Sequence, residues 1–88
     1  MQQEEFMASL TSEAFQETVT VQREANGEMA LHTHPFEAKA LILQGRLQIS
    51  VDGVERLYGV GDVFHLAANQ PHAERYGPAG VTYLVGRK

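Results

Sequence analysis

Three histidines carry the clearest chemical signal in this chain. His32 and His34 stand one residue apart in the stretch LHTHPFEAKALILQG, and His72 follows a proline much later in the sequence. On a β-strand, residues two apart point to the same face. The first two imidazoles therefore project together from Cα atoms roughly 6.6 Å apart, so both can reach one ion through bonds of about 2 Å. Spacing alone leaves open whether these are metal ligands or surface histidines that are merely neighbours.

Short β-strands are the elements that must position these side chains. In residues 17–24 valine and threonine alternate, and β-branched residues at every second position are typical of a strand. Residues 46–59 predict a hairpin, because Asp52-Gly53 supplies the left-handed positions of a tight turn. Seven or eight short strands at this spacing indicate a sandwich or a small barrel. The remaining strands are predicted in residues 28–34, 38–45, 62–67, 73–77 and 81–88.

The first fourteen residues stand apart from this alternating pattern. Phe6, Met7 and Leu10 have helical spacing, but the segment is short. We expect residues 1–14 to form an arm or a single turn of helix. Residues 15–88 are expected to form one domain, because 88 residues are too few for two.

Composition narrows the class of protein. The chain has no cysteine, so it has neither disulfides nor thiolate metal sites. Its net charge of −4 argues against a nucleic-acid partner, which needs clustered lysine and arginine. No apolar run approaches the roughly 20 residues of a membrane span, and the acidic start does not resemble a signal peptide. We therefore expect a cytoplasmic protein without a nucleic-acid or membrane partner. A homodimer is a reasonable expectation, since a small all-β chain must hide its sheet edges.

Two linked sequence motifs surround the histidines. The first runs from Gly27 through the HTH sequence to Gly45. The second is GDVFHLAANQPHAERY, in which Gly61 leads and His72 occupies the position of a motif histidine. In both motifs and in their spacing the chain resembles a small single-domain cupin of the RmlC-like superfamily, over about residues 17–85.

This resemblance implies a fold and a site. The implied fold is all-β, a small antiparallel β-barrel or jelly roll with a short N-terminal arm. The implied site is one divalent transition metal bound by His32, His34 and His72. The expected partner of such a site is a small-molecule ligand or substrate.

The chain departs from the cupin pattern at the glutamate ligand. In the cupin pattern three or four residues separate the second histidine from this glutamate. The corresponding positions in this chain are Ala38 and Lys39. Glu37 stands one position too early, and strand parity turns it away from the histidines unless a bulge at Pro35 rotates it inward. Glu37 is therefore either a fourth ligand or a surface carboxylate. Asn69 replaces a motif glycine, and asparagine tolerates the left-handed conformation.

A site of three neutral imidazoles would keep open coordination positions, which distinguish catalytic from structural metal sites. The candidate ions are Zn, Fe, Ni, Cu and Mn. Iron would suit the dioxygenase chemistry that the resemblance implies, whereas zinc or nickel would suit a Lewis-acid isomerase or lyase. The uncompensated charge of the ion favours anionic ligands. No catalytic group is assigned, but the acid–base candidates are Tyr58, Tyr76, Tyr83, Glu37 and Lys39. His65 is expected to point away from the core.

Three functions remain open from the sequence. The first is a metal-dependent enzyme of the dioxygenase, isomerase or lyase type, acting on a small anionic or chelating molecule. The second is a non-catalytic module that binds a small molecule as a sensor. The third is a structural barrel with a vestigial site, which the missing glutamate supports. A fold resemblance by itself does not choose among them.

Overall fold

The computed structural model describes all 88 residues and contains one helix and six strands. The predicted all-β fold with a short N-terminal element is confirmed. No helix has the length or the hydropathy needed to span a bilayer. The elements are α1 (Gln3–Ser12), β1 (Glu17–Arg23), β2 (Glu28–His32), β3 (Ala38–Val51), β4 (Val54–Tyr58), β5 (Val63–Leu66) and β6 (His72–Arg87).

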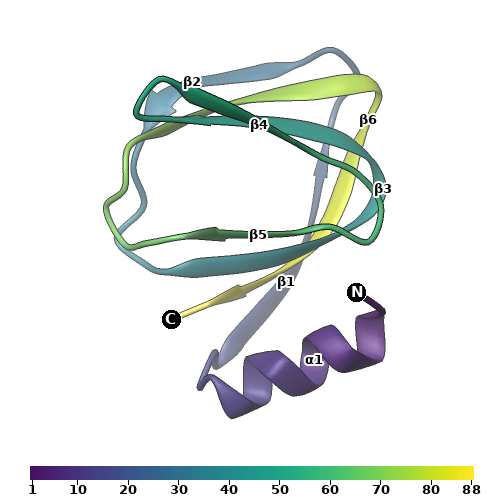
Figure 1. Ribbon diagram of the computed structural model, residues 1–88, viewed down its shortest axis with the longest axis vertical. Helices are drawn as coiled ribbons and strands as arrows, with labels where there is room; N and C mark the ends of the chain where they lie inside the picture. The colour runs from purple at the N-terminus through teal and green to yellow at the C-terminus, as the bar shows by residue number, and fades with distance from the viewer.

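The six strands form one antiparallel sheet that folds over into two layers (Figure 1). The long strands β3 and β6 pair with each other and run through both layers. In one layer they are flanked by β5 and β1, and in the other by β4 and β2. Because β4 and β5 do not pair with each other, the jelly roll stays open between these two edges.

Two glycines let the long strands pass from one layer to the other. Gly45 in β3 and Gly80 in β6 both have positive φ, at 78° and 72°. A Cβ atom at Gly45 would lie 2.0 Å from the carbonyl oxygen of Gly80, so only glycine fits this corner. The prediction of seven or eight short strands was wrong here, because segments expected to be separate are continuous through these bends.

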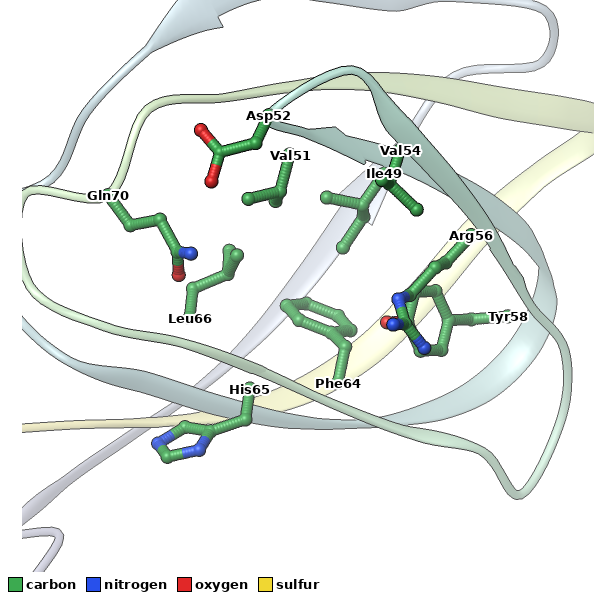
Figure 2. A pocket seen from close by; sticks show the side chains of 10 residues that line it. All are labelled: Ile49, Val51, Asp52, Val54, Arg56, Tyr58, Phe64, His65, Leu66 and Gln70. Carbon is green, nitrogen blue, oxygen red and sulfur yellow. The ribbon is translucent and has the colours of Figure 1, made fainter.

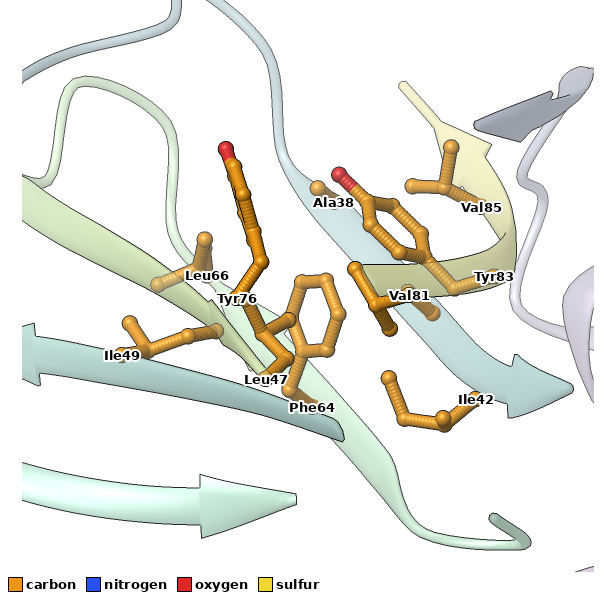
Figure 3. Close-up of a cluster of buried hydrophobic side chains, with 11 residues drawn as sticks. Ala38, Ile42, Leu47, Ile49, Phe64, Leu66, Tyr76, Val81, Tyr83 and Val85 are labelled. Carbon is orange, nitrogen blue, oxygen red and sulfur yellow. The ribbon is translucent and has the colours of Figure 1, made fainter. Parts of the chain in front are cut away.

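The apolar core lies between the two layers. Phe64, Tyr83 and Ile42 are all buried in this core, and the aromatic rings of Phe64 and Tyr83 pack edge to face with centroids 5.3 Å apart (Figure 3). Asp52 and Gly53 take φ of 51° and 77°, which confirms the predicted tight turn between β3 and β4.

Helix α1 packs on the outside of the layer that contains β1, β3 and β5 (Figure 1). Its Phe6 and Leu10 side chains are fully buried, and they contact Leu41 and Leu84 on the outward face of this layer. The helix is longer than the single turn that was expected. Tertiary packing of an apolar stripe stabilises short helices that would not form alone, and the sequence pattern did not show what the stripe packs against.

Candidate metal centre

The structure brings together the three histidines that the sequence singled out. The ring centroids of His32 and His72 lie 4.2 Å apart, those of His32 and His34 4.8 Å, and those of His34 and His72 5.1 Å. The Glu74 carboxylate joins them, and one donor atom from each of the four residues lies within 4.8 Å of the others. This cluster, His32, His34, His72 and Glu74, is called the metal-binding cluster below.

Strand register places the cluster. β2 and β6 run antiparallel, and His32 pairs directly with His72. The register shifts between Met29 and His32, which is a β-bulge that re-aims the end of β2. His34 lies just beyond β2, where its carbonyl oxygen accepts a hydrogen bond from the Asn69 backbone N–H at 2.6 Å. Asn69 has φ of 62°, so the residue that replaces the motif glycine does adopt the left-handed conformation.

Backbone carbonyls orient two of the imidazoles. The His32 Nδ1–H donates to the Ala30 carbonyl oxygen at 2.6 Å, and the His72 Nδ1–H donates to that of Gln70 at 2.9 Å. Since Nδ1 holds the proton in each ring, the Nε2 lone pair is left to accept. Both Nε2 atoms are buried without a hydrogen-bond partner. An Nδ1–H bound to a backbone carbonyl, with Nε2 free, is the arrangement that prepares a histidine to bind a metal.

Glu74 was missed by the sequence analysis. Its Oε2 lies 3.4 Å from Nε2 of His72 and 3.5 Å from Nε2 of His32, while its Oε1 is buried without a partner. Glu74 follows His72 by two residues, the same spacing that joins His32 to His34, so parity along β6 could have revealed it. Ala38, at the expected glutamate position, lines a small cavity beside these residues but offers no donor atom.

Burial shifts the pKa values of three titratable groups in this region. Burial, and then the neighbouring His32 and His72 rings, lowers the pKa of His34 below its ordinary value. His34 is therefore neutral near neutral pH, and neutral imidazole is the form that binds a metal. Burial and the nearby Glu74 charge raise the pKa of Tyr83, and they raise that of Tyr76 to about 12. Both tyrosines thus stay protonated near neutral pH, and each keeps an O–H that can donate a hydrogen bond.

Two cavities enter the jelly roll, and they share a wall. The metal-binding cluster borders a cavity of about 40 Å³, to which it contributes His34, His72 and Glu74. A larger cavity of about 310 Å³ opens between the unpaired edges of β4 and β5 (Figure 2). Phe64 and Leu66 border both cavities, so they separate the open one from the cluster.

His65 and Glu37 lie on the opposite side of the sheet from the cluster. Figure 2 shows the His65 ring pointing away from Phe64 and Leu66, as strand parity predicted. Its Nε2 is hydrogen-bonded to the Glu37 carboxylate, which also faces Lys88 at 3.9 Å. Glu37 therefore keeps its expected parity and lies outside the metal-binding cluster.

The remaining acid–base candidates divide between the two sides of the sheet. Tyr58 borders the larger cavity, away from the cluster. Lys39 is on the outer face, where its Nζ donates to Glu13 at 2.7 Å and to the Ser9 hydroxyl at 3.2 Å. Tyr83 is the only one of the proposed acid–base groups that lines the cavity beside the cluster.

Sequence comparison assigns this fold to a family. The sequence profile of the cupin domain matches residues 19–77, well over half of the chain. The chain is a cupin. Within this cupin the matched range holds all four residues of the metal-binding cluster. No curated protein is similar enough in sequence to be matched.

Solved structures share the cupin fold. A lyase named for DMSP, DddQ from Ruegeria pomeroyi, superposes with a TM-score of 0.73 at 28% identity, over 81% of this chain and 36% of that one. An RmlC-like cupin from Shewanella frigidimarina gives 0.68 at 20% identity, over 80% and 63%. An oxalate decarboxylase variant from B. subtilis gives 0.69 at 18% identity, over 81% and 20%. This cupin thus spans less than two thirds of each of these three chains.

Proposed function

We propose that the metal-binding cluster holds one divalent transition metal and that this cupin is a metal-dependent enzyme acting on a small anionic or chelating molecule. The proposal is carried by the cluster geometry: four donor atoms lie within 4.8 Å of one another, and the Nε2 atoms of His32 and His72 are buried without partners. Three nitrogen donors and one carboxylate suit Zn, Fe, Ni, Cu or Mn.

The donor set fits an ion of this size. Ligand atoms around a tetrahedral ion with bonds of about 2.0 Å are separated by about 3.3 Å. Glu74 Oε2 lies 3.4 and 3.5 Å from the two unpartnered Nε2 atoms, so the carboxylate already has close to the spacing of a ligand from both imidazoles. His34 lacks a backbone anchor for its ring in the structure, and its ring would make the larger adjustment. The carboxylate also offsets part of the ion's charge, which argues against a vestigial site.

The residues around the site could supply a proton acceptor, a hydrogen-bond donor and an apolar wall. A divalent ion at such a site supplies Lewis-acid or, for iron, redox chemistry. Glu74 Oε1 is buried, free of partners and the only carboxylate oxygen on the cavity wall that could accept a substrate proton. Tyr83, with its raised pKa, stays a hydrogen-bond donor. Phe64 and Leu66 give the cavity an apolar wall on the side of the larger cavity.

The reaction type is proposed as dioxygenase, isomerase or lyase. Support comes from the shared fold of a DMSP lyase and an oxalate decarboxylase, whose activities are stated here of those proteins alone. A non-catalytic binding module is the alternative, and it would use the same cavity. The cytoplasmic location and the homodimer stay predictions.

Metal analysis tests the site first. Protein purified by gel filtration, stripped and reloaded separately with each candidate ion is expected to retain about one ion per chain for at least one of them. Retention well below this for every ion contradicts the proposal. The same column reports whether the chain is a dimer.

Activity separates the enzyme from the module. Oxygen uptake by the Fe(II)-loaded protein is measured against thiols, diketones and keto acids, and Zn- or Ni-loaded protein is assayed for isomerisation and elimination on the same panel. Turnover of any compound supports the enzyme. Tight binding of a compound without turnover in either form supports the module instead.

A further inference from the structure

Two arginines border the same small cavity as the metal-binding cluster. Arg23 is the last residue of β1 and Arg87 the last residue of β6, and both line the cavity beside His34 and Glu74. Glu74 is the only carboxylate on this wall. With a divalent ion bound, the cavity would hold more positive than negative charge, and an anion placed between the ion and the arginines would relieve it.

Arg87 is held in place by a column of stacked groups. Its guanidinium carbon lies 4.9 Å from the centroid of the Phe36 ring. The Phe36 ring stacks in turn on His34, with centroids 4.9 Å apart and planes inclined by 18°. At its outer end, Arg87 Nη1 donates to Glu17 at 3.4 Å. In this column a single ring, that of Phe36, lies between the guanidinium and His34 of the metal-binding cluster.

One N–H of this guanidinium has no acceptor in the protein. Arg87 Nε is buried and lacks a hydrogen-bond partner, although the guanidinium makes its surface contact to Glu17 through another nitrogen. Buried donors without acceptors are rare in native proteins, and each needs an explanation. A guanidinium presents its N–H groups in a planar fork that matches a carboxylate.

We propose that Arg87, assisted by Arg23, binds the carboxylate of a small organic acid whose second oxygen faces the metal-binding cluster. The second half of this statement rests on the proposed function, whereas the carboxylate site on Arg87 does not. The cavity wall carries two arginines and one glutamate, so the ligand that it favours is an anion. Arg87 is then a specificity-determining residue for the site.

The size of the cavity limits the acid. A single water needs about 10–15 Å³ of such volume, and drug-sized ligands occupy pockets of roughly 300 Å³ or more. The cavity beside the cluster measures about 40 Å³, so it admits only a few heavy atoms. The ligand class is therefore a hydroxy or keto acid of about two or three carbons.

Calorimetric titration of glycolate into Zn-loaded protein tests this proposal. Glycolate carries a carboxylate and a neighbouring oxygen, and glycolamide is its uncharged analogue. Arg87→Gln is expected to weaken glycolate binding about tenfold or more and to leave glycolamide binding unchanged. Arg75→Gln is the matched control, because this substitution removes the same charge from the same strand at a strongly exposed position. It should bind glycolate like the unaltered protein.

A conservative variant guards against a folding artefact. Arg87→Lys keeps the charge and much of the stacking but lacks the planar fork, so a glycolate affinity between those of Arg87→Gln and the unaltered protein supports the proposal. Equal glycolate affinity in the unaltered protein, Arg87→Gln and Arg87→Lys, with zinc still bound to all three, overturns the carboxylate site and leaves the metal site standing.

A second readout does not depend on metal. In the ¹H–¹⁵N spectrum of metal-free protein, the Arg87 Nε–H resonance should shift on addition of glycolate but not of glycolamide. If the chain bound no metal, this shift would still support the carboxylate site while the proposed function failed. Absence of the shift, together with unchanged affinities in the variants, contradicts the inference.

Discussion

Two histidine–carboxylate pairs lie on opposite sides of one sheet, and their difference shows what marks a functional site here. His72 and Glu74 are 1% and 7% exposed, and each has a polar atom without a partner. His65 and Glu37 are 55% and 31% exposed and are hydrogen-bonded to each other. The residue types are the same. Only the inner pair leaves lone pairs buried and unused, a state that costs free energy unless something binds there.

The largest expected difference between the two pairs is the effect of removing each histidine on zinc binding. We expect His72→Ala to weaken zinc binding more than about 100-fold, because loss even of a residue that only orients a ligand costs 10–100-fold. His65→Ala should leave zinc binding unchanged, since its ring faces outward. The measurement is metal content per chain after dialysis, with a competing chelator to obtain affinities. Metal loss in the outer variant but not the inner one would reverse the assignment.

Shortening Phe6 should separate stability from metal binding. Phe6 is fully buried between α1 and the outward face of the sheet. The buried residues that it packs with include no member of the metal-binding cluster. Phe6→Ala is expected to lower the free energy of unfolding by about 3 kcal/mol or more, as buried Phe→Ala changes do. Chemical denaturation measures this change, and metal content should stay the same. Met7→Ala on the exposed side of the helix is the control and should have little effect.

The two carboxylates give a milder version of the histidine comparison. Glu74→Gln should raise the zinc dissociation constant about tenfold or more, because an anionic donor becomes neutral while three imidazoles remain. Glu37→Gln should change it less than about twofold, since its partners are His65 and Lys88 on the outer face. Equal effects of the two substitutions would mean that Glu74 does not contact the ion.

The smallest expected effect is a pH-dependent contribution on the outer face. The hydrogen bond from Lys39, with the Lys39 charge, lowers the pKa of Glu13 below its ordinary value, although Glu13 is exposed. A lowered pKa in the folded state stabilises the fold above the ordinary carboxyl pKa, and this contribution disappears as the pH falls through the folded-state pKa.

Thermal unfolding checks this contribution. Glu13→Gln should lower the melting temperature slightly at about pH 7 and less at about pH 3, because protonation of the Glu13 carboxylate removes the charge that Lys39 stabilises. Glu55→Gln on β4 is the control and should show no such difference between the two pH values. A pH-independent effect of Glu13→Gln would show that the ion pair is not the cause.

The local features of this cupin could be predicted from its sequence. Alternation of apolar and polar residues predicted strands, Asp52-Gly53 predicted its turn, and parity turned His32 and His34 to one face and His65 to the other. These features depend on backbone geometry within a few residues, which sequence patterns report directly.

Contacts between residues far apart in the sequence became known only from the folded chain. His72 and Glu74 reach His32 and His34 because β2 pairs with β6 in a register shifted by one bulge, and Gly45 and Gly80 allow β3 and β6 to cross between layers. Helix α1 forms because its apolar stripe meets the outward face of the sheet. Strand pairing and packing between residues far apart in sequence arise from the balance of the whole core, so no local pattern could place them.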